Sequence, residues 1–186
     1  QNIKVDEFAS STKIEALAAE LQRIKKSPDK GRHKSIVFSQ YNRMIDLCEF
    51  RLKQLGLQTV KLMGYMPMKE RRSVLHAFKS RPDVDVILMS LKAGGEGLNL
   101  QEAAQVFILD PWWNPQVEAQ AIQRAHRLGQ KHKVVAIKFV TSDSIEERMH
   151  ELSNRKQLMF EGTVDGSAFA LSQLTSDDLK FLFTGT

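Results

Sequence analysis

The chain has 186 residues, and its 27 basic and 22 acidic side chains give a net charge of +5. The length suits one domain, and 42% hydrophobic with 26% charged residues excludes disordered, collagenous and fibrous proteins. The single cysteine, Cys48, excludes an intrachain disulfide and indicates a reducing compartment. No apolar run reaches the roughly 18 residues of a membrane span, so we expect no membrane partner. The start at Gln1 instead of Met suggests a piece of something longer.

The first predicted element is a helix from Thr12 to about Lys26. Its apolar residues recur at helical spacing and fall on one face: Ile14, Leu17, Ala18, Leu21 and Ile24. Thr12 and Glu15 have the spacing of a capping box, in which each side chain accepts a hydrogen bond from the other residue's backbone N–H. The sequence therefore predicts that the helix is capped at Thr12.

Strands and helices then alternate along the chain. In order, the expected elements are a strand at 35–38, a helix ending before Gly56, a strand at 59–63, a helix from Pro67 to about Lys79, strands at 85–89 and 106–109, a helix from Pro115 to about Leu128, a strand at 134–140, a long helix capped by Ser144, and a short helix capped by Thr175 or Ser176. This alternation predicts an α/β fold, a parallel sheet with helices on both faces. Ligands of such sheets bind where the strands end.

A glycine-rich loop follows the strand at 85–89. Gly94, Gly95 and Gly97 lack the Cβ atoms that would keep the backbone away from a phosphate group. A flexible turn explains the same glycines equally well. The Walker A pattern occurs nowhere in the chain, so we do not expect a self-contained nucleoside triphosphate site.

The helix from Pro115 carries the sharpest pattern. Gln120, Arg124 and Arg127 would share one face, because they stand at positions i, i+4 and i+7. A solvated basic face is the ordinary reason for such a pattern. The functional alternative is a pair of guanidinium groups that neutralise charge on a transferring phosphoryl group. No Ser or Cys nucleophile accompanies His126, which therefore receives no acid–base role.

Two adjacent tryptophans, Trp112 and Trp113, would point in opposite directions if the backbone were extended. One of them should then be partly exposed, where it could brace a nucleic-acid backbone or stack on a base. A cover over the apolar edge of the sheet is an equally open role for Trp112. Basic residues near the strand ends also fit a groove that contacts a phosphate backbone, although each alone is more often solvated surface: Lys61, Lys69, Arg71, Arg72 and Lys92.

Taken together, these segments resemble the second RecA-like lobe of the Swi/Snf-type DNA translocases of helicase superfamily two. The matching stretches lie in the family's order at 36–40, 62–66, 88–100, 110–115, 120–130 and 144–148. The branch looks like the RING-finger-carrying DNA-repair translocases, in particular those of global-genome nucleotide excision repair. The RING, the Walker A loop and the acidic metal-binding box of that branch are missing here. The resemblance therefore implies the C-terminal lobe alone, with a helix and linker at 1–32, the lobe core at 33–142, and a helical brace and tail at 143–186.

The resemblance also implies roles for single residues. Arg124 and Arg127 would be arginine fingers that reach ATP, which is bound with its Mg mainly by the N-terminal RecA-like lobe of the same parent chain. Other residues of the nucleotide side would be Gly95, Glu96, Gly97 and Gln120. The contacts to the DNA backbone would come from Ser39, Gln40, Gly64, Ser90, Lys92 and Trp113. The family usually has Asp before the first finger, whereas this chain has Gln123.

The implied function is the second motor lobe of an ATP-dependent double-stranded DNA translocase in DNA repair or chromatin remodelling. Its parent would act in the nucleus with chromatin or repair proteins, and the chain alone would be inactive. Eight acidic and four basic residues give residues 141–186 a charge of −4, which leaves +9 on residues 1–140 and fits a polyanionic partner. Two alternatives stay open: a non-enzymatic nucleic-acid-binding module of the same fold, and, with little support, an open α/β enzyme that binds a nucleotide sugar or phosphate.

Overall fold

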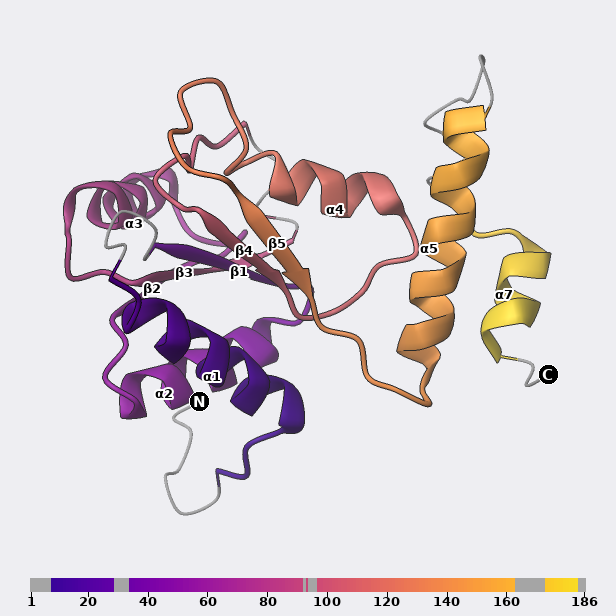
Figure 1. Cartoon of the computed structure of the whole chain (residues 1–186), viewed down its shortest axis with the longest axis horizontal. Coiled ribbons are helices and arrows are strands. Elements are labelled where there is room, and N and C mark those ends of the chain that lie inside the picture. The colour runs from indigo at the N-terminus through magenta and orange to yellow at the C-terminus, as the bar shows by residue number, and fades with distance from the viewer. Residues whose placement is uncertain (1–7, 29–33, 92, 94–96, 163–172, 184–186) are drawn as a thin grey trace.

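The computed structural model describes residues 8–28, 34–91, 93, 97–162 and 173–183. Within these ranges the chain forms, in order, α1 (Thr12–Lys25), β1 (Ser35–Ser39), α2 (Asn42–Gln54), β2 (Thr59–Leu62), α3 (Met68–Ser80), β3 (Val86–Ser90), β4 (Gln105–Ile108), α4 (Pro115–Ile122), β5 (Val135–Lys138), α5 (Ile145–Gly162) and α7 (Ser176–Phe183). The five strands are parallel in the order β2-β3-β1-β4-β5 (Figure 1). The predicted α/β fold is confirmed.

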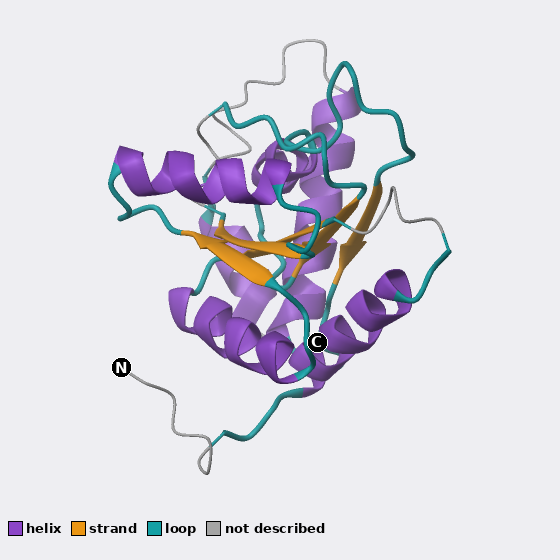
Figure 2. Ribbon diagram, turned by 90° about the vertical axis from the view of Figure 1, so that its left-hand side faces the viewer, coloured by secondary structure: helices purple, strands orange, loops and turns teal. Residues whose placement is uncertain are grey.

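Helices cover both faces of the sheet, as Figure 2 shows. Side chains on both faces of β1 pack against helices. Val37 packs in the layer with α1 and α2, while Ile36 and Phe38 pack in the opposite layer with α3 and α4. All five residues of β1 and of β3 are buried. A strand buried on both faces favours a continuous apolar run, and residues 36–38 and 86–89 show one, with serines only at the strand ends.

Helix caps differ from the prediction at α1 and decide an open choice at α7. Ser11, not Thr12, caps α1, because its Oγ accepts a hydrogen bond from Ile14 N at 3.4 Å. Glu15 pairs instead with Arg51 of α2, whose hydrogen bonds lower the pKa of that carboxyl to about 2. At α7 the cap is Thr175, since its Oγ1 accepts from Asp178 N at 3.1 Å while the Asp178 carboxylate accepts from Thr175 N at 2.9 Å.

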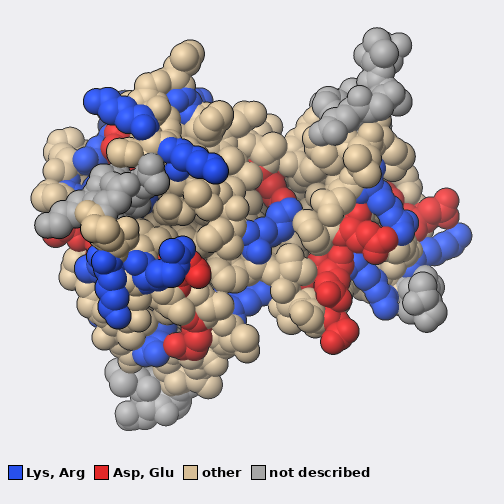
Figure 3. All heavy atoms as spheres, viewed as in Figure 1, with Lys and Arg blue, Asp and Glu red and all other residues tan. Residues whose placement is uncertain are grey.

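The two C-terminal helices form a layer beyond the edge of the sheet. In Figure 1, α5 stands beside α4, and α7 lies along the outer side of α5. Arg148 of α5 donates to the Leu182 carbonyl of α7 at 3.2 Å. On the face drawn in Figure 3, acidic side chains gather over this helix pair, interleaved with basic ones. None of the helices in the described ranges is long and apolar enough to cross a membrane.

Candidate functional site

The candidate site lies at the carboxyl edge, the edge at which all five parallel strands end. Ser39 and Ser90 are partners in the register of β1 and β3, and both side chains are buried there. Gly64 and half-buried Gln40 follow the ends of β2 and β1, and Gly64 is exposed. The structure thus brings Ser39, Gln40, Gly64 and Ser90 to one edge, whereas Lys92 lies outside the described residues.

Asp110 organises the turn between β1 and α2. Its Oδ2 accepts hydrogen bonds from Ser39 Oγ and, at 3.1 Å, from Gln40 N. Ser39 Oγ in turn accepts from Tyr41 N at 3.0 Å. Because Asp110 is only 6% exposed, these bonds satisfy a carboxylate that would otherwise be costly to bury. Sequence reasoning missed this role, although an aspartate directly after a buried strand was a usable signal.

The segment after α4 is a series of tight turns and not a helix. Arg124 N bonds to Ala121 O at 3.2 Å, and Ala125 N bonds to Ile122 O at 3.1 Å. These bonds to the third preceding carbonyl tighten the chain and end α4 at Ile122. The predicted helix to Leu128 is therefore wrong, and so is the shared helical face of Gln120, Arg124 and Arg127. Exposed Gln120 stays on α4, while both arginines lie in the turns.

This arginine turn, residues 123–130, is bonded directly to the end of the glycine-rich loop. Leu100 N donates to Arg124 O at 3.0 Å, and Arg127 Nη1 donates to Gly97 O at 3.3 Å. Gln130 Nε2 adds bonds to the carbonyls of Gln101 and Ala103, both at 2.9 Å. The structure therefore brings together Gly97, Arg124 and Arg127. Gly95 and Glu96 lie outside the described residues.

Arg124 is the least satisfied of these side chains. It is 9% exposed, and its Nε is buried with no hydrogen-bond partner among the described residues. Burial lowers the pKa of Arg124, and the nearby charge of Arg127 lowers it further. A buried guanidinium nitrogen without an acceptor is costly in a folded protein unless a ligand supplies one.

The two tryptophans lie together and do not point in opposite directions. Their ring centroids are 5.8 Å apart, and both side chains are half-buried. Neither ring is fully in the core. Trp112 N bonds to Glu118 Oε1 at 2.9 Å, and Asn114 Oδ1 accepts from Gln116 N at 3.0 Å. These bonds fold residues 110–115 back onto the start of α4.

Some of the basic residues predicted to contact a phosphate backbone are paired or buried within the lobe. Lys61 lies near the end of β2, and its Nζ pairs with Asp46 at 2.6 Å and Glu49 at 2.9 Å. Arg71 is buried, whereas Lys69 and Arg72 are exposed. No group of three or more His, Cys, Asp or Glu side chains that could hold a metal occurs in the described part of the chain.

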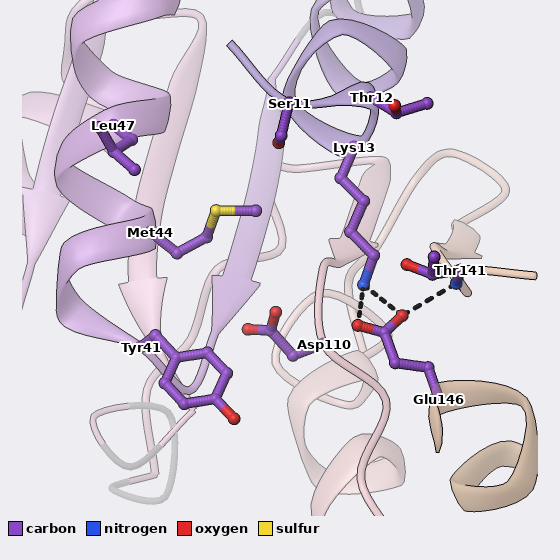
Figure 4. Close-up of a pocket in the computed structure, with 9 residues that line it drawn as sticks. All are labelled: Ser11, Thr12, Lys13, Tyr41, Met44, Leu47, Asp110, Thr141 and Glu146. Carbon is purple, nitrogen blue, oxygen red and sulfur yellow. Dashed lines mark hydrogen bonds and ion pairs between the residues drawn. The ribbon is translucent and has the colours of Figure 1, made fainter. Parts of the chain in front are cut away.

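A cavity of about 440 Å³ opens between α1, α2 and the carboxyl edge (Figure 4). The Lys13 side chain lines one side of this cavity. Its Nζ donates to Leu109 O at 2.6 Å and to Glu146 Oε1 at 2.7 Å. Burial alone would raise the pKa of Glu146, but hydrogen bonds from Lys13 and Thr141 outweigh it and leave that pKa below its ordinary value. Lys13 thus ties α1 to the end of β4 and to α5, a role that the sequence did not indicate.

Comparisons with known proteins place this geometry in a family. The family model described as the helicase conserved C-terminal domain matches residues 12–129. The chain belongs to this helicase family. A solved structure, that of the C-terminal part of the Fun30 ATPase domain, matches 97% of this chain and 54% of its own length, with a TM-score of 0.78 and 31% identity. The predicted RecA-like C-terminal lobe is confirmed.

Curated relatives of this helicase lobe are much longer proteins. It is 45% identical to the ATP-dependent helicase rhp16 of Schizosaccharomyces pombe over 98% of the chain. It is 42% identical to the DNA repair protein RAD5B of Arabidopsis thaliana over 96% of the chain, and 40% identical to the human Helicase-like transcription factor over 94%. The lobe spans 21%, 14% and 17% of these proteins. The names confirm the resemblance to helicases and DNA-repair proteins that the motifs predicted.

A glycine substitution tests how tightly the arginine turn of the helicase lobe is held. Gly129 has a φ of +99°, and an added Cβ would lie 3.0 Å from Gln101 Oε1. Gly129→Ala should therefore lower the free energy of unfolding by about 1–2 kcal/mol, measured by urea denaturation. Gly64→Ala is the matched control, because a Cβ there meets nothing within 4 Å. Equal effects of the two substitutions would contradict the prediction.

Proposed function

We propose that this chain is the second motor lobe of an ATP-dependent double-stranded DNA translocase that acts in DNA repair or chromatin remodelling in the nucleus. The observation that carries the proposal is Arg124, which is buried beside the loop that ends at Leu100. Its Nε has no hydrogen-bond partner among the described residues. A planar guanidinium suits the oxygens of a phosphate group. The names of the relatives, an ATP-dependent helicase and a DNA repair protein among them, support a parent that uses ATP on DNA.

In this proposal Arg124 and Arg127 stabilise charge on the phosphates of ATP. A second lobe of the same parent, the N-terminal RecA-like lobe, binds most of the ATP together with its Mg. Gly95, Glu96, Gly97 and Gln120 form this chain's remaining nucleotide side. Two arginines alone cannot position a water or a metal, so the reaction needs the other lobe.

The bonds between the arginine turn and the glycine-rich loop give the proposal its coupling step. Gly97 and Leu100 are tied to Arg127 and Arg124, and the same loop begins at Ser90 on the carboxyl edge. A displacement of the arginines when the lobes close is thereby passed through the loop to that edge. Repeated closing and opening would move the lobe's contacts along the DNA.

The DNA contacts in this proposal are Ser39, Gln40, Gly64, Ser90, Lys92 and Trp113. Exposed Gly64 lets the phosphate backbone approach closely, and the bonds of Asp110 fix the turn that carries Gln40. Contacts to phosphates and not to base edges make binding independent of sequence and sensitive to salt. Helices α5 and α7 act as a brace behind the lobe, and chromatin or repair proteins are further partners.

ATP turnover tests the division of labour between two lobes. We expect no ATP hydrolysis by the isolated 186-residue chain, with or without duplex DNA, and DNA-stimulated hydrolysis when the chain is joined to a lobe with a Walker A loop. The assay is phosphate release at saturating ATP. Appreciable turnover by the isolated chain that disappears in its Arg124→Ala variant would contradict the proposal, because it would mean that this lobe holds a complete site.

A further inference from the structure

Lys156 of α5 is a buried cation that joins three separate segments. Its side chain is 6% exposed, and its Nζ lies 2.9 Å from Asp178 Oδ2 of α7 and 2.6 Å from the Gln173 carbonyl. The same Nζ stands 5.2 Å from the centroid of the Trp113 ring. An ammonium group is rarely buried without such partners, because it loses its hydration. Lys156 is therefore fixed in one position against the face of Trp113.

Other cations of α5 hold α7 but do not reach the tryptophan loop. The Arg155 guanidinium lies 4.3 Å from the centroid of the Phe181 ring, and Arg148 donates to Leu182 O. Both partners belong to α7. Within the described residues, Lys156 is the one of these three α5 cations whose contacts extend from the helix pair to Trp113. The contacts of Arg148 and Arg155 with α7 do not involve Trp113.

Separate contacts hold the backbone around Trp113 and its ring. The backbone around it is held by the Asn114 cap of α4 and by the bond from Trp112 N to Glu118. Its half-buried ring has Trp112 at 5.8 Å and Lys156 as described partners. A cation over a ring face is attracted by the ring quadrupole, most strongly for tryptophan and where water is excluded.

We infer that Lys156 is a positioning residue, which holds the ring of Trp113 in the orientation that meets DNA, and that α7 sets this position through Asp178. The inference rests on the proposed function for the DNA contact of Trp113. Lys156 is too deeply buried to touch a phosphate itself, so its effect on DNA passes through the tryptophan. The carboxylate of Asp178 is aligned in turn by its reciprocal cap with Thr175. The C-terminal helix pair thus tunes DNA contact without touching DNA.

Tryptophan fluorescence tests the contact directly. The chain has two tryptophans, so Trp112→Phe leaves Trp113 as the sole emitter. In that background we expect Lys156→Met to shift the emission and increase quenching by acrylamide, whereas Lys156→Arg keeps the original signal. Arg155→Met is the matched control, because it removes the neighbouring cation–ring contact to α7 and leaves Trp113 alone. Unchanged fluorescence in Lys156→Met, with thermal unfolding intact, would overturn the inference.

DNA affinity tests what the contact does. Lys156→Met should weaken binding of a duplex DNA by roughly 3- to 30-fold, the range that a desolvated cation–ring contact can supply. Trp113→Ala should weaken it by at least as much, and the double variant should lose nothing further. Arg155→Met should bind DNA like the original chain, although it removes the same charge. Losses that multiply in the double variant would overturn the positioning role.

The DNA-binding result for Trp113→Ala distinguishes a failure of the proposed function from a failure of the inference about Lys156. If Trp113→Ala binds DNA like the original chain, the proposed DNA contact of Trp113 is wrong, and with it the DNA half of the inference. The fluorescence series still decides whether Lys156 orients the ring. Asp178→Asn provides a second variant if Lys156→Met does not fold, and we expect it to shift Trp113 emission in the same direction. No shift in a folded Asp178→Asn would overturn the link to α7.

Discussion

Arg124→Ala should reduce ATP hydrolysis by about a thousandfold or more in a two-lobe protein that carries this chain, because arginine fingers contribute factors of roughly 10³–10⁵ to phosphoryl transfer. Duplex DNA binding should be unchanged, since Arg124 lies in the arginine turn and not among the proposed DNA contacts. Folding should also be kept, because the Nε that the substitution removes has no described hydrogen-bond partner. The measurement is the DNA-stimulated rate of phosphate release.

Two variants sharpen this prediction. Arg124→Lys keeps the charge but loses the planar fork, so it should not restore the rate. Gln123→Ala changes the neighbouring exposed side chain and should leave the rate close to that of the original protein. A rate for Arg124→Ala within tenfold of the original would show that Arg124 does not act on the nucleotide.

Asp110→Ala should lower the free energy of unfolding by about 3 kcal/mol or more. The carboxylate accepts two hydrogen bonds, from Ser39 Oγ and Gln40 N, and bonds to a charged group contribute about 1.5–3 kcal/mol each. The substitution also leaves the buried Ser39 hydroxyl without that acceptor. Urea denaturation of the isolated chain measures the change.

Controls separate this effect from a general loss of negative charge. Asp83→Ala removes an exposed carboxylate that pairs with Arg81, and it should have little effect because water screens such pairs. Asp110→Asn should fall between the two, since its amide oxygen still accepts but carries no charge. An Asp110→Ala variant as stable as Asp83→Ala would contradict the role given to Asp110 in the β1–α2 turn.

Local sequence patterns predicted the layers of this fold well. The run from Ile36 to Phe38 is apolar at every position, which is typical of a strand covered on both faces. Positions of glycine were informative where the backbone needs them, since Gly56 ends α2 with a φ of +73°. The carboxyl edge followed from the parallel arrangement, because parallel strands all end on the same side.

The errors arose where tertiary contacts override local preference. Residues 123–128 contain neither Gly nor Pro, so nothing in the local sequence ends α4 at Ile122. The bond from Leu100 N to Arg124 O accompanies the turn that replaces the last helical turns. Asp110 lies 71 residues from its partner Ser39, and Lys13 lies 133 residues from Glu146. No periodicity within one segment can indicate such pairs.

The position of β5 determines where the lobe can be cut. The family match ends at Gly129, but β5 lies beyond it and pairs with β4 from Gln105 to Ile108. The Phe139 ring also lies 6.1 Å from that of Phe107, and Phe139 N donates to Ile108 O at 2.9 Å. A chain ending at Gly129 would leave the backbone groups of β4 open to another strand, a common cause of self-association. We therefore expect that a shortened lobe avoids self-association through β4 only if the chain continues at least through Phe139.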